Sequence, residues 1–130
     1  MAIQIETNQG IRLIRMAGQA STQSFSEEFL PKIARAIDEA LSDSDIKGII
    51  LTGEGRFFSA GADINAFQQS IDDENAPELI RNLTGILHPL LVRMRTSPTV
   101  VIAALNGVSA GGGLGPVSYT HLTLPTIYSV

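Results

Sequence analysis

Alternating apolar and polar residues open the chain. Ile3 and Ile5 alternate with polar neighbours, residues 8–10 (Asn-Gln-Gly) have turn chemistry, and a second run rich in apolar residues follows at 11–16. Strand-like runs on either side of such a turn are typical of a β-hairpin. The pattern therefore predicts a hairpin at the start of the chain.

The spacing of the apolar residues changes after Ser26, where they recur at intervals of three and four as far as Leu41. This spacing predicts an amphipathic helix with one apolar stripe. Either Ser26 itself, or Ser24 together with Glu27, could cap its N-terminus. Pro31 fits such a helix only in the first turn, which leaves the starting residue open.

Two short, mostly apolar runs at 46–52 and 99–105 have the composition of strands buried in a parallel sheet. A strand, a helix and a further strand normally form a right-handed crossover unit. The order of the elements predicts an α/β fold in which a parallel sheet has flanking helices. No linker divides residues 1–115, so we expect them to form one folded unit.

Two helices are expected between these strands. Apolar periodicity predicts a short helix over 64–69 and a long one from an Asn75 cap to about Thr96. Pro89 should kink the long helix. The acidic run 72–74 is expected to be a solvated loop rather than a metal site, because no other chelating side chain is near it in the sequence.

Glycine-rich segments follow both predicted buried strands, at 53–63 and 108–115. In open α/β sheets, ligands bind beyond the carboxyl ends of the strands. Glycine there lets a backbone N–H approach a ligand closely. Two such segments aimed at one point could form an oxyanion hole. The alternative is that the glycines only permit tight turns or close packing.

Other known site motifs do not fit these segments. A P-loop requires a lysine, which both segments lack, and the dinucleotide fingerprint fails because its last glycine position holds Phe58 in one segment and Pro116 in the other. Ser59 and Ser109 have no evident histidine base nearby in the sequence. A serine hydrolase is therefore disfavoured.

Composition narrows the function classes further. The 130 residues include 9 Lys+Arg and 13 Asp+Glu, and a net charge of -4 argues against nucleic-acid binding. The absence of cysteine excludes disulfides, thiolate metal sites and cysteine nucleophiles. No apolar stretch approaches the roughly 20 residues of a membrane span, and the N-terminus lacks a secretory signal pattern. We expect a cytoplasmic protein without a membrane partner.

Residues 51–64 (LTGEGRFFSAGADI) and 97–113 (SPTVVIAALNGVSAGGG) closely resemble the two signature segments of the enoyl-CoA hydratase/isomerase (crotonase) superfamily. The resemblance covers residues 1–115 and implies a truncated crotonase spiral of ββα units. It also implies an acyl-CoA substrate, with coenzyme A as part of the thioester rather than a separate cofactor, and no metal. The full-length form is expected to be a homo-oligomer.

The resemblance assigns site roles to five residues. The N–H groups of Ala62 and Gly112 match the two oxyanion donors, which makes them the expected catalytic groups. Ala60, Ala62, Asp63 and Ile64 match the positions that contact coenzyme A. For Asp63, a role as N-cap of the following helix is favoured over a catalytic one.

The sequence also departs from the family. Residues 23–26 (Gln-Ser-Phe-Ser) replace the common Asn-Ala-Leu-Ser, and Gly115 stands where hydratases have a glutamate. His88 is expected to be a surface or interface residue. Without a visible acid or base we expect this chain to be inactive by itself, and hydratase and isomerase chemistry stay open. The alternatives are a non-catalytic acyl-CoA-binding or assembly module, or a chain that does not fold alone.

The last 15 residues, 116–130, contain no charge and no glycine. Residues 117–126 resemble the translation of a transposon-end adapter used in sequencing libraries. We therefore predict that 116–130 is a non-native tail. The alternative is a natural short strand, because Val, Tyr, Thr and Ile favour β structure.

Overall fold

The computed structural model describes residues 3–17 and 22–111. The elements in chain order are β1 (Ile3–Asn8), β2 (Ile11–Met16), α1 (Phe29–Ser42), β3 (Gly48–Gly53), β4 (Phe57–Ser59), α2 (Ile64–Asp72), α3 (Ala76–Thr96), β5 (Val100–Ala104) and β6 (Val108–Ser109). The predicted hairpin, helices and buried strands are all present. Gly112 and the predicted tail 116–130 lie outside the described residues.

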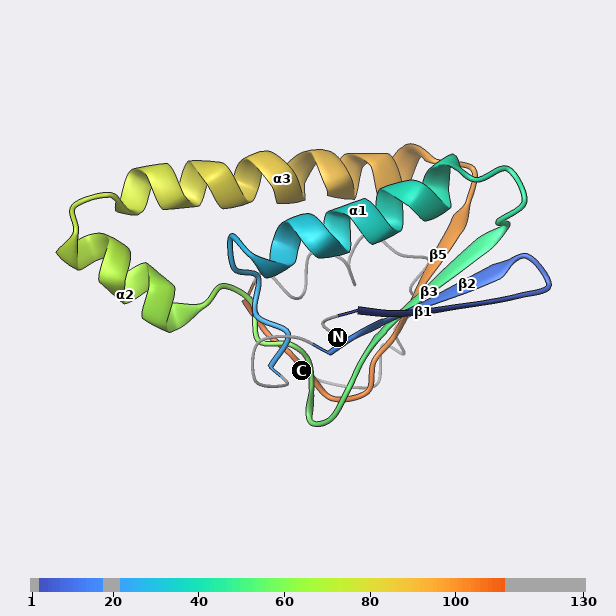
Figure 1. Cartoon of the computed structure of the whole chain (residues 1–130), viewed down its shortest axis with the longest axis horizontal. Helices are drawn as coiled ribbons and strands as arrows, with labels where there is room; N and C mark the ends of the chain where they lie inside the picture. Colours follow the sequence, from blue (N-terminus) through green and yellow to red (C-terminus); the bar gives the residue numbers. More distant parts are fainter. Residues whose placement is uncertain (1–2, 18–21, 112–130) are drawn as a thin grey trace, which may run out of the picture.

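Four strands form the main sheet in the order β1-β2-β3-β5. β1 and β2 are the antiparallel hairpin, whereas β2, β3 and β5 run parallel to one another. Helices α1 and α3 lie together on one side of this sheet, and α2 extends away from it (Figure 1). The α/β prediction is therefore confirmed, with a mixed rather than purely parallel sheet.

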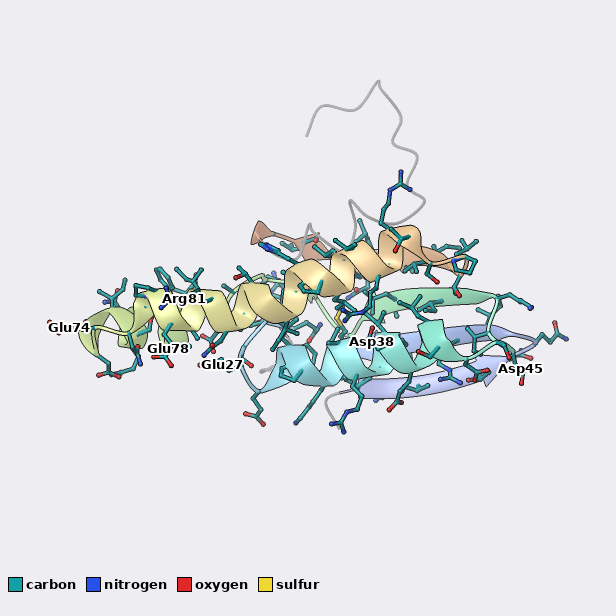
Figure 2. All side chains as sticks on the ribbon, turned by 90° about the horizontal axis from the view of Figure 1, so that it is seen from above. Glu27, Asp38, Asp45, Glu74, Glu78 and Arg81 are labelled. Carbon is teal, nitrogen blue, oxygen red and sulfur yellow. The ribbon has the colours of Figure 1, made fainter. Side chains whose placement is uncertain are left out.

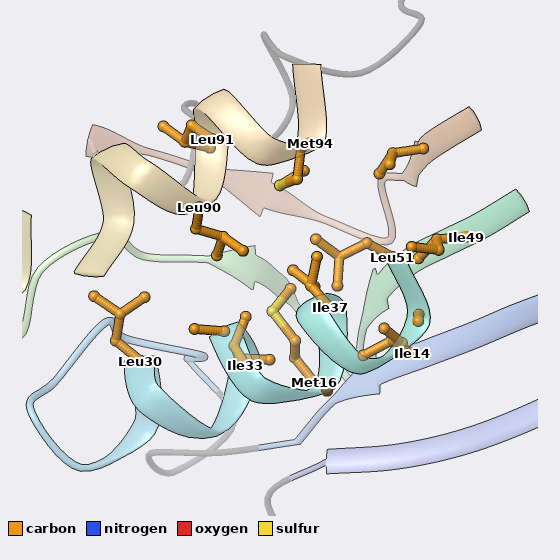
Figure 3. Packing of buried hydrophobic residues seen from close by; sticks show 14 of the residues in the cluster. Ile14, Met16, Leu30, Ile33, Ile37, Ile49, Leu51, Leu90, Leu91 and Met94 are labelled. Atoms are coloured by element: carbon orange, nitrogen blue, oxygen red, sulfur yellow. The ribbon is translucent and has the colours of Figure 1, made fainter. Parts of the chain in front are cut away.

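The hydrophobic core lies between the sheet and the two long helices (Figure 3). Alternate residues of the central strands point into it, because side chains on a strand alternate between faces. Its largest fully buried apolar side chains are Phe58, Ile14, Met16, Leu30, Ile37, Ile49, Leu51, Leu90 and Val101. This core fixes the strand ends from which the glycine-rich segments leave.

Of the two caps predicted for α1, the structure shows the one made by Ser26. The Ser26 hydroxyl oxygen accepts a hydrogen bond of 3.0 Å from the Phe29 N–H, at the first residue of the helix. The Ser24 hydroxyl instead bonds to that of Thr22 at 2.8 Å. Pro31 is the third residue of the helix, close enough to the N-terminus for proline to be tolerated.

Two strands were not predicted. β4 and β6 lie inside the two segments expected to be loops, and they pair in parallel as a separate two-stranded sheet. α2 also continues to Asp72, beyond the predicted end at residue 69. The side-chain amides of Gln68 and Gln69 donate to the carboxylates of Asp72 and Asp73, which supports this extra turn.

The long helix α3 begins and ends as predicted, and the predicted residue stands at its N-cap. Asn75 occupies the N-cap position, but its side chain makes no capping hydrogen bond. The helix continues without interruption through Pro89. The Arg93 guanidinium donates two hydrogen bonds, of 2.7 and 2.8 Å, to the Asp38 carboxylate, which ties α3 to α1. In the ranges 3–17 and 22–111, no helix is long and apolar enough to cross a membrane.

Candidate active site

The two glycine-rich segments leave the same edge of the main sheet, because β3 and β5 are parallel neighbours. Beyond that edge, backbone hydrogen bonds join the two segments. The Val108 N–H donates to the Arg56 carbonyl and the Ala110 N–H to the Ser59 carbonyl, each at 3.0 Å. The predicted convergence of the two segments is therefore confirmed as far as Gly111, the last described residue.

Gly61 and Gly111 lie near each other where the two segments meet. Both have positive φ, at 85° and 53°, a conformation that favours glycine. A Cβ added to Gly111 would lie 3.9 Å from the Cα of Gly61. The residues that follow, Ala62 and Gly112, carry the two predicted donors. Gly112 lies outside the described residues.

The Ala62 N–H is held in place by its neighbours while remaining available. The Gly61 carbonyl accepts a 2.7 Å hydrogen bond from the Phe25 N–H, and the Ala60 N–H donates to the Thr22 carbonyl at 2.9 Å. Ala62 itself is exposed, and its N–H donates no hydrogen bond within the described part of the chain. A fixed, unused backbone donor is what an oxyanion hole requires.

Asp63 is the N-cap of α2, as the sequence predicts. One carboxylate oxygen accepts hydrogen bonds from the Asn65 N–H at 3.0 Å and the Ala66 N–H at 3.3 Å. These bonds satisfy backbone donors that have no partner within the helix. The carboxylate therefore anchors α2 directly beside Ala62.

Replacing Asp63 with alanine should lower the free energy of unfolding by about 1 kcal/mol, because the cap is lost. Asp63→Asn is the matched control, since asparagine caps helices about as well as aspartate. Urea unfolding of the two variants measures the difference. Equal losses in both variants would show that the charge, rather than the cap, carries the stabilisation.

A partly polar recess lies on one side of Ala62. All four residues predicted to contact coenzyme A line it, and its volume is ≈ 440 Å³. Its lining residues are Thr22, Ser24, Ala60, Ala62, Asp63, Ile64 and Asn65. The Ile64 side chain is 80% exposed, which is unusual for a large apolar residue and leaves it available to a ligand.

A mostly apolar groove adjoins this recess at Ala62, between the start of α1 and helices α2 and α3. Its volume is ≈ 510 Å³. Its apolar lining residues are Phe25, Leu30, Ala62, Ala66, Phe67, Leu79, Ile80, Leu83 and Leu87. Ala62 and Asp63 line both the groove and the recess. One molecule lying across Ala62 could therefore occupy both.

Gln23 supports the site in a way that the sequence did not indicate. It is fully buried with a positive φ of 52°. Its side-chain amide nitrogen donates to the carbonyls of Glu54 and Phe57 at 2.9 and 2.7 Å. Gln23 thus fixes the segment that leads into β4. The only sequence signal was that residues 23–26 depart from the family pattern.

Asn106 holds the same segment from the other side. Its side-chain oxygen accepts from the Gly53 N–H at 2.9 Å, and its nitrogen donates to the carbonyls of Gly55 and Phe57 at 3.0 Å. We call Gln23 and Asn106 the amide clamp. The sequence marked Asn106 only as the end of a strand, although an Asn-Gly pair after a buried strand signals a turn.

The other candidate side chains, His88 and Ser59, lie on the surface and in the structural support of the glycine turn, respectively. His88 is exposed on α3, as predicted, and contributes to the groove wall. The buried Ser59 hydroxyl donates to the Gln23 carbonyl at 2.8 Å and accepts from the Gly61 N–H at 3.2 Å, so it supports the glycine turn. Within residues 3–17 and 22–111, no group of three His, Asp or Glu side chains could hold a metal ion.

A helix-covered sheet with two glycine-rich segments meeting beyond parallel strands defines an α/β protein of the crotonase fold. The crystal structure of an enoyl-CoA hydratase from Bacillus halodurans has a similar fold. It superposes with a TM-score of 0.84 over 93% of this chain and 48% of that one, at 20% sequence identity. The predicted fold is confirmed.

The sequence profile of the family described as enoyl-CoA hydratase/isomerase matches residues 6–124. The chain belongs to this family. A relative from Bacillus subtilis (strain 168), named probable enoyl-CoA hydratase, is 34% identical over 78% of this chain and 38% of its own length. Small ribosomal subunit protein mS47 of Schizosaccharomyces pombe is 38% identical over 68% of this chain and 20% of its own. The chain thus spans well under half the length of these relatives.

Proposed function

We propose that the chain binds an acyl-CoA thioester across Ala62, with the coenzyme in the recess and the acyl group in the groove. The Ala62 N–H, together with that of Gly112, donates to the thioester carbonyl oxygen. The observation that carries this proposal is the unused Ala62 N–H at the junction of the two cavities. Membership of the enoyl-CoA hydratase/isomerase family supports it.

The chemistry that such a donor assists is enolate formation. When a base removes a proton from the carbon next to the thioester, the electron pair of that C–H bond moves into a new C=C bond. The carbonyl oxygen becomes negative. Donors fixed at that oxygen stabilise the charge and lower the barrier, each by roughly 3 kcal/mol. The contribution of Ala62 is to stabilise this negative charge, and a separate base must remove the proton.

Enolate formation also needs a group that accepts the proton, and neither Asp63 nor Gly115 is suited to this role. The Asp63 carboxylate already holds the N-terminus of α2. Gly115, at the position where hydratases carry a glutamate, cannot act as acid or base. The function proposed for this chain is therefore thioester binding and polarisation, and complete turnover would need a base from elsewhere.

Calorimetric titration of the 130-residue chain with hexanoyl-CoA and with free coenzyme A tests the proposal. We expect hexanoyl-CoA to bind at least about tenfold more tightly, because only the thioester reaches the groove, where buried methylenes are worth about 0.8 kcal/mol each. A folded chain that binds neither ligand would overturn the proposal.

One relative favours a second candidate. The chain is 38% identical to a relative named small ribosomal subunit protein mS47. By its name, that relative is a component of a large assembly. An assembly module would keep the fold while having no use for the Ala62 N–H. Cooperative unfolding of the chain combined with no binding of any CoA thioester would support this second function.

A further inference from the structure

The direction of the Ala62 N–H is set by the peptide bond that joins Ala62 to Gly61. The Gly61 carbonyl accepts its 2.7 Å hydrogen bond from the Phe25 N–H, and Phe25 and Ala62 form a single parallel β-bridge. In a planar trans peptide, the N–H points away from the carbonyl. The Ala62 N–H therefore points away from Phe25, and any group that fixes the plane of this peptide also fixes the donor.

Phe25 supports the carbonyl side of this peptide firmly. Its side chain is buried and belongs to the hydrophobic core. Its segment runs directly into α1, past Glu27 just before that helix begins (Figure 2). The Ser26 carbonyl also accepts a 2.9 Å hydrogen bond from the Leu30 N–H in the first turn of the helix. One side of the Gly61–Ala62 peptide is thus tied to the core.

The other side of the peptide depends on the backbone rotation of Gly61, which has no Cβ to limit it. Here the Ser59 hydroxyl acts as the support. Its oxygen accepts a 3.2 Å hydrogen bond from the Gly61 N–H, and it donates a 2.8 Å hydrogen bond to the Gln23 carbonyl. Gly61 is therefore held through both its N–H and its carbonyl.

Ser59 is itself fixed in place. It is fully buried in β4, and its carbonyl accepts the hydrogen bond from the Ala110 N–H of the other glycine-rich segment. Gln23, which receives the hydroxyl proton, is one half of the amide clamp. A hydroxyl can donate and accept at the same oxygen, which an apolar side chain cannot do. Alanine at this position would therefore lose both bonds at once.

We infer that Ser59 is a positioning residue for the oxyanion donor, and that its hydroxyl keeps the Ala62 N–H aimed at the thioester oxygen. This inference rests on the proposed function, because it requires a thioester at Ala62. Ser59 lines neither the recess nor the groove. Its loss should therefore misdirect the donor while leaving both binding surfaces intact.

Two measurements on bound hexanoyl-CoA test this role in Ser59→Ala. Exchange of the α-protons into D₂O, with imidazole as the base, should slow roughly tenfold, because the donor is misaligned rather than lost. The shift of the ¹³C-labelled carbonyl to lower stretching frequency should also be smaller at saturating ligand. Affinity for free coenzyme A should not change. A merely structural role would lower stability without altering the frequency of the ligand that is bound.

Two other serines provide matched controls. The Ser70 hydroxyl donates a 2.6 Å hydrogen bond to the Phe67 carbonyl within α2. Ser70→Ala should cost stability without changing either measurement. Ser109 pairs with Ser59 in the register of β4 and β6, and its buried hydroxyl has no hydrogen-bond partner among the residues that the structure describes. Ser109→Ala should match the parent chain in both measurements.

Amide hydrogen exchange of the parent chain, followed by NMR, adds a test that needs no variant. The Gly61 N–H should exchange slowly and the exposed Ala62 N–H quickly. Equal exchange of these two amides would overturn the inference. A folded Ser59→Ala chain with the parent's α-proton exchange rate and frequency shift would also overturn it, while leaving Ala62 as the donor. Absence of any frequency shift in the parent chain would instead overturn the proposed function, and the inference with it.

Discussion

Removing the Ala62 N–H is expected to slow enolate formation on a bound acyl-CoA by about 10²–10³-fold, the usual effect of losing one oxyanion donor. Ala62→Pro removes this donor. The preceding Gly61 can accommodate a proline after it because it lacks a Cβ. Exchange of the α-protons of bound hexanoyl-CoA into D₂O, with imidazole buffer as the base, measures enolate formation directly.

Ala62→Gly is the matched control, because it keeps the N–H and removes only the methyl group. It should retain exchange within a few-fold of the parent chain. Thermal unfolding of both variants checks that the fold persists. Equal exchange rates in Ala62→Pro and Ala62→Gly would show that the Ala62 N–H takes no part in stabilising the enolate.

Gly107→Ala is expected to disrupt the contact between the two glycine-rich segments and to destabilise the chain by about 3 kcal/mol, the upper end of the usual overpacking cost. A Cβ on Gly107 would overlap the Arg56 carbonyl oxygen and lie 2.6 Å from the carbonyl carbon. Both atoms are backbone, so no side-chain rotation can relieve the overlap. The Arg56 carbonyl is also the acceptor for the Val108 N–H that joins the segments.

Gly85→Ala is the control for this substitution. A Cβ at Gly85 would meet no atom within 4 Å, and the residue lies inside α3. Alanine favours the helix by up to about 1 kcal/mol over glycine, so this variant should be slightly more stable than the parent. Urea unfolding measures both variants. If Gly107→Ala is as stable as Gly85→Ala, the close contact with Arg56 does not exist in solution.

The elements with clear periodicity could be predicted from the sequence because their patterns are long. α1 and α3 each present a full apolar stripe, and β3 and β5 are mostly apolar runs. β4 and β6 have only 3 and 2 residues, too few to show alternation. Their pairing depends on contacts between segments about 50 residues apart, which local patterns do not record.

Parts of the site could likewise be predicted from local sequence, and other parts could not. The Ala62 and Asp63 positions follow from a contiguous motif and a capping rule, and all four predicted coenzyme contacts line one recess. The amide clamp could not be predicted. Gln23 adopts a positive φ that is uncommon for glutamine, and its acceptors lie 31 and 34 residues further along the chain. Such long-range hydrogen bonds become visible only once the fold places the partners together.

The most direct test of the central claim is the carbonyl stretching frequency of bound hexanoyl-CoA labelled with ¹³C at the thioester carbon. Hydrogen-bond donors at the oxygen weaken the C=O bond. We expect a shift to lower frequency when the ligand binds the parent chain or Ala62→Gly, and a much smaller shift with Ala62→Pro. The same shift in all three proteins, or no shift in the parent chain, would contradict the claim that the Ala62 N–H polarises the thioester.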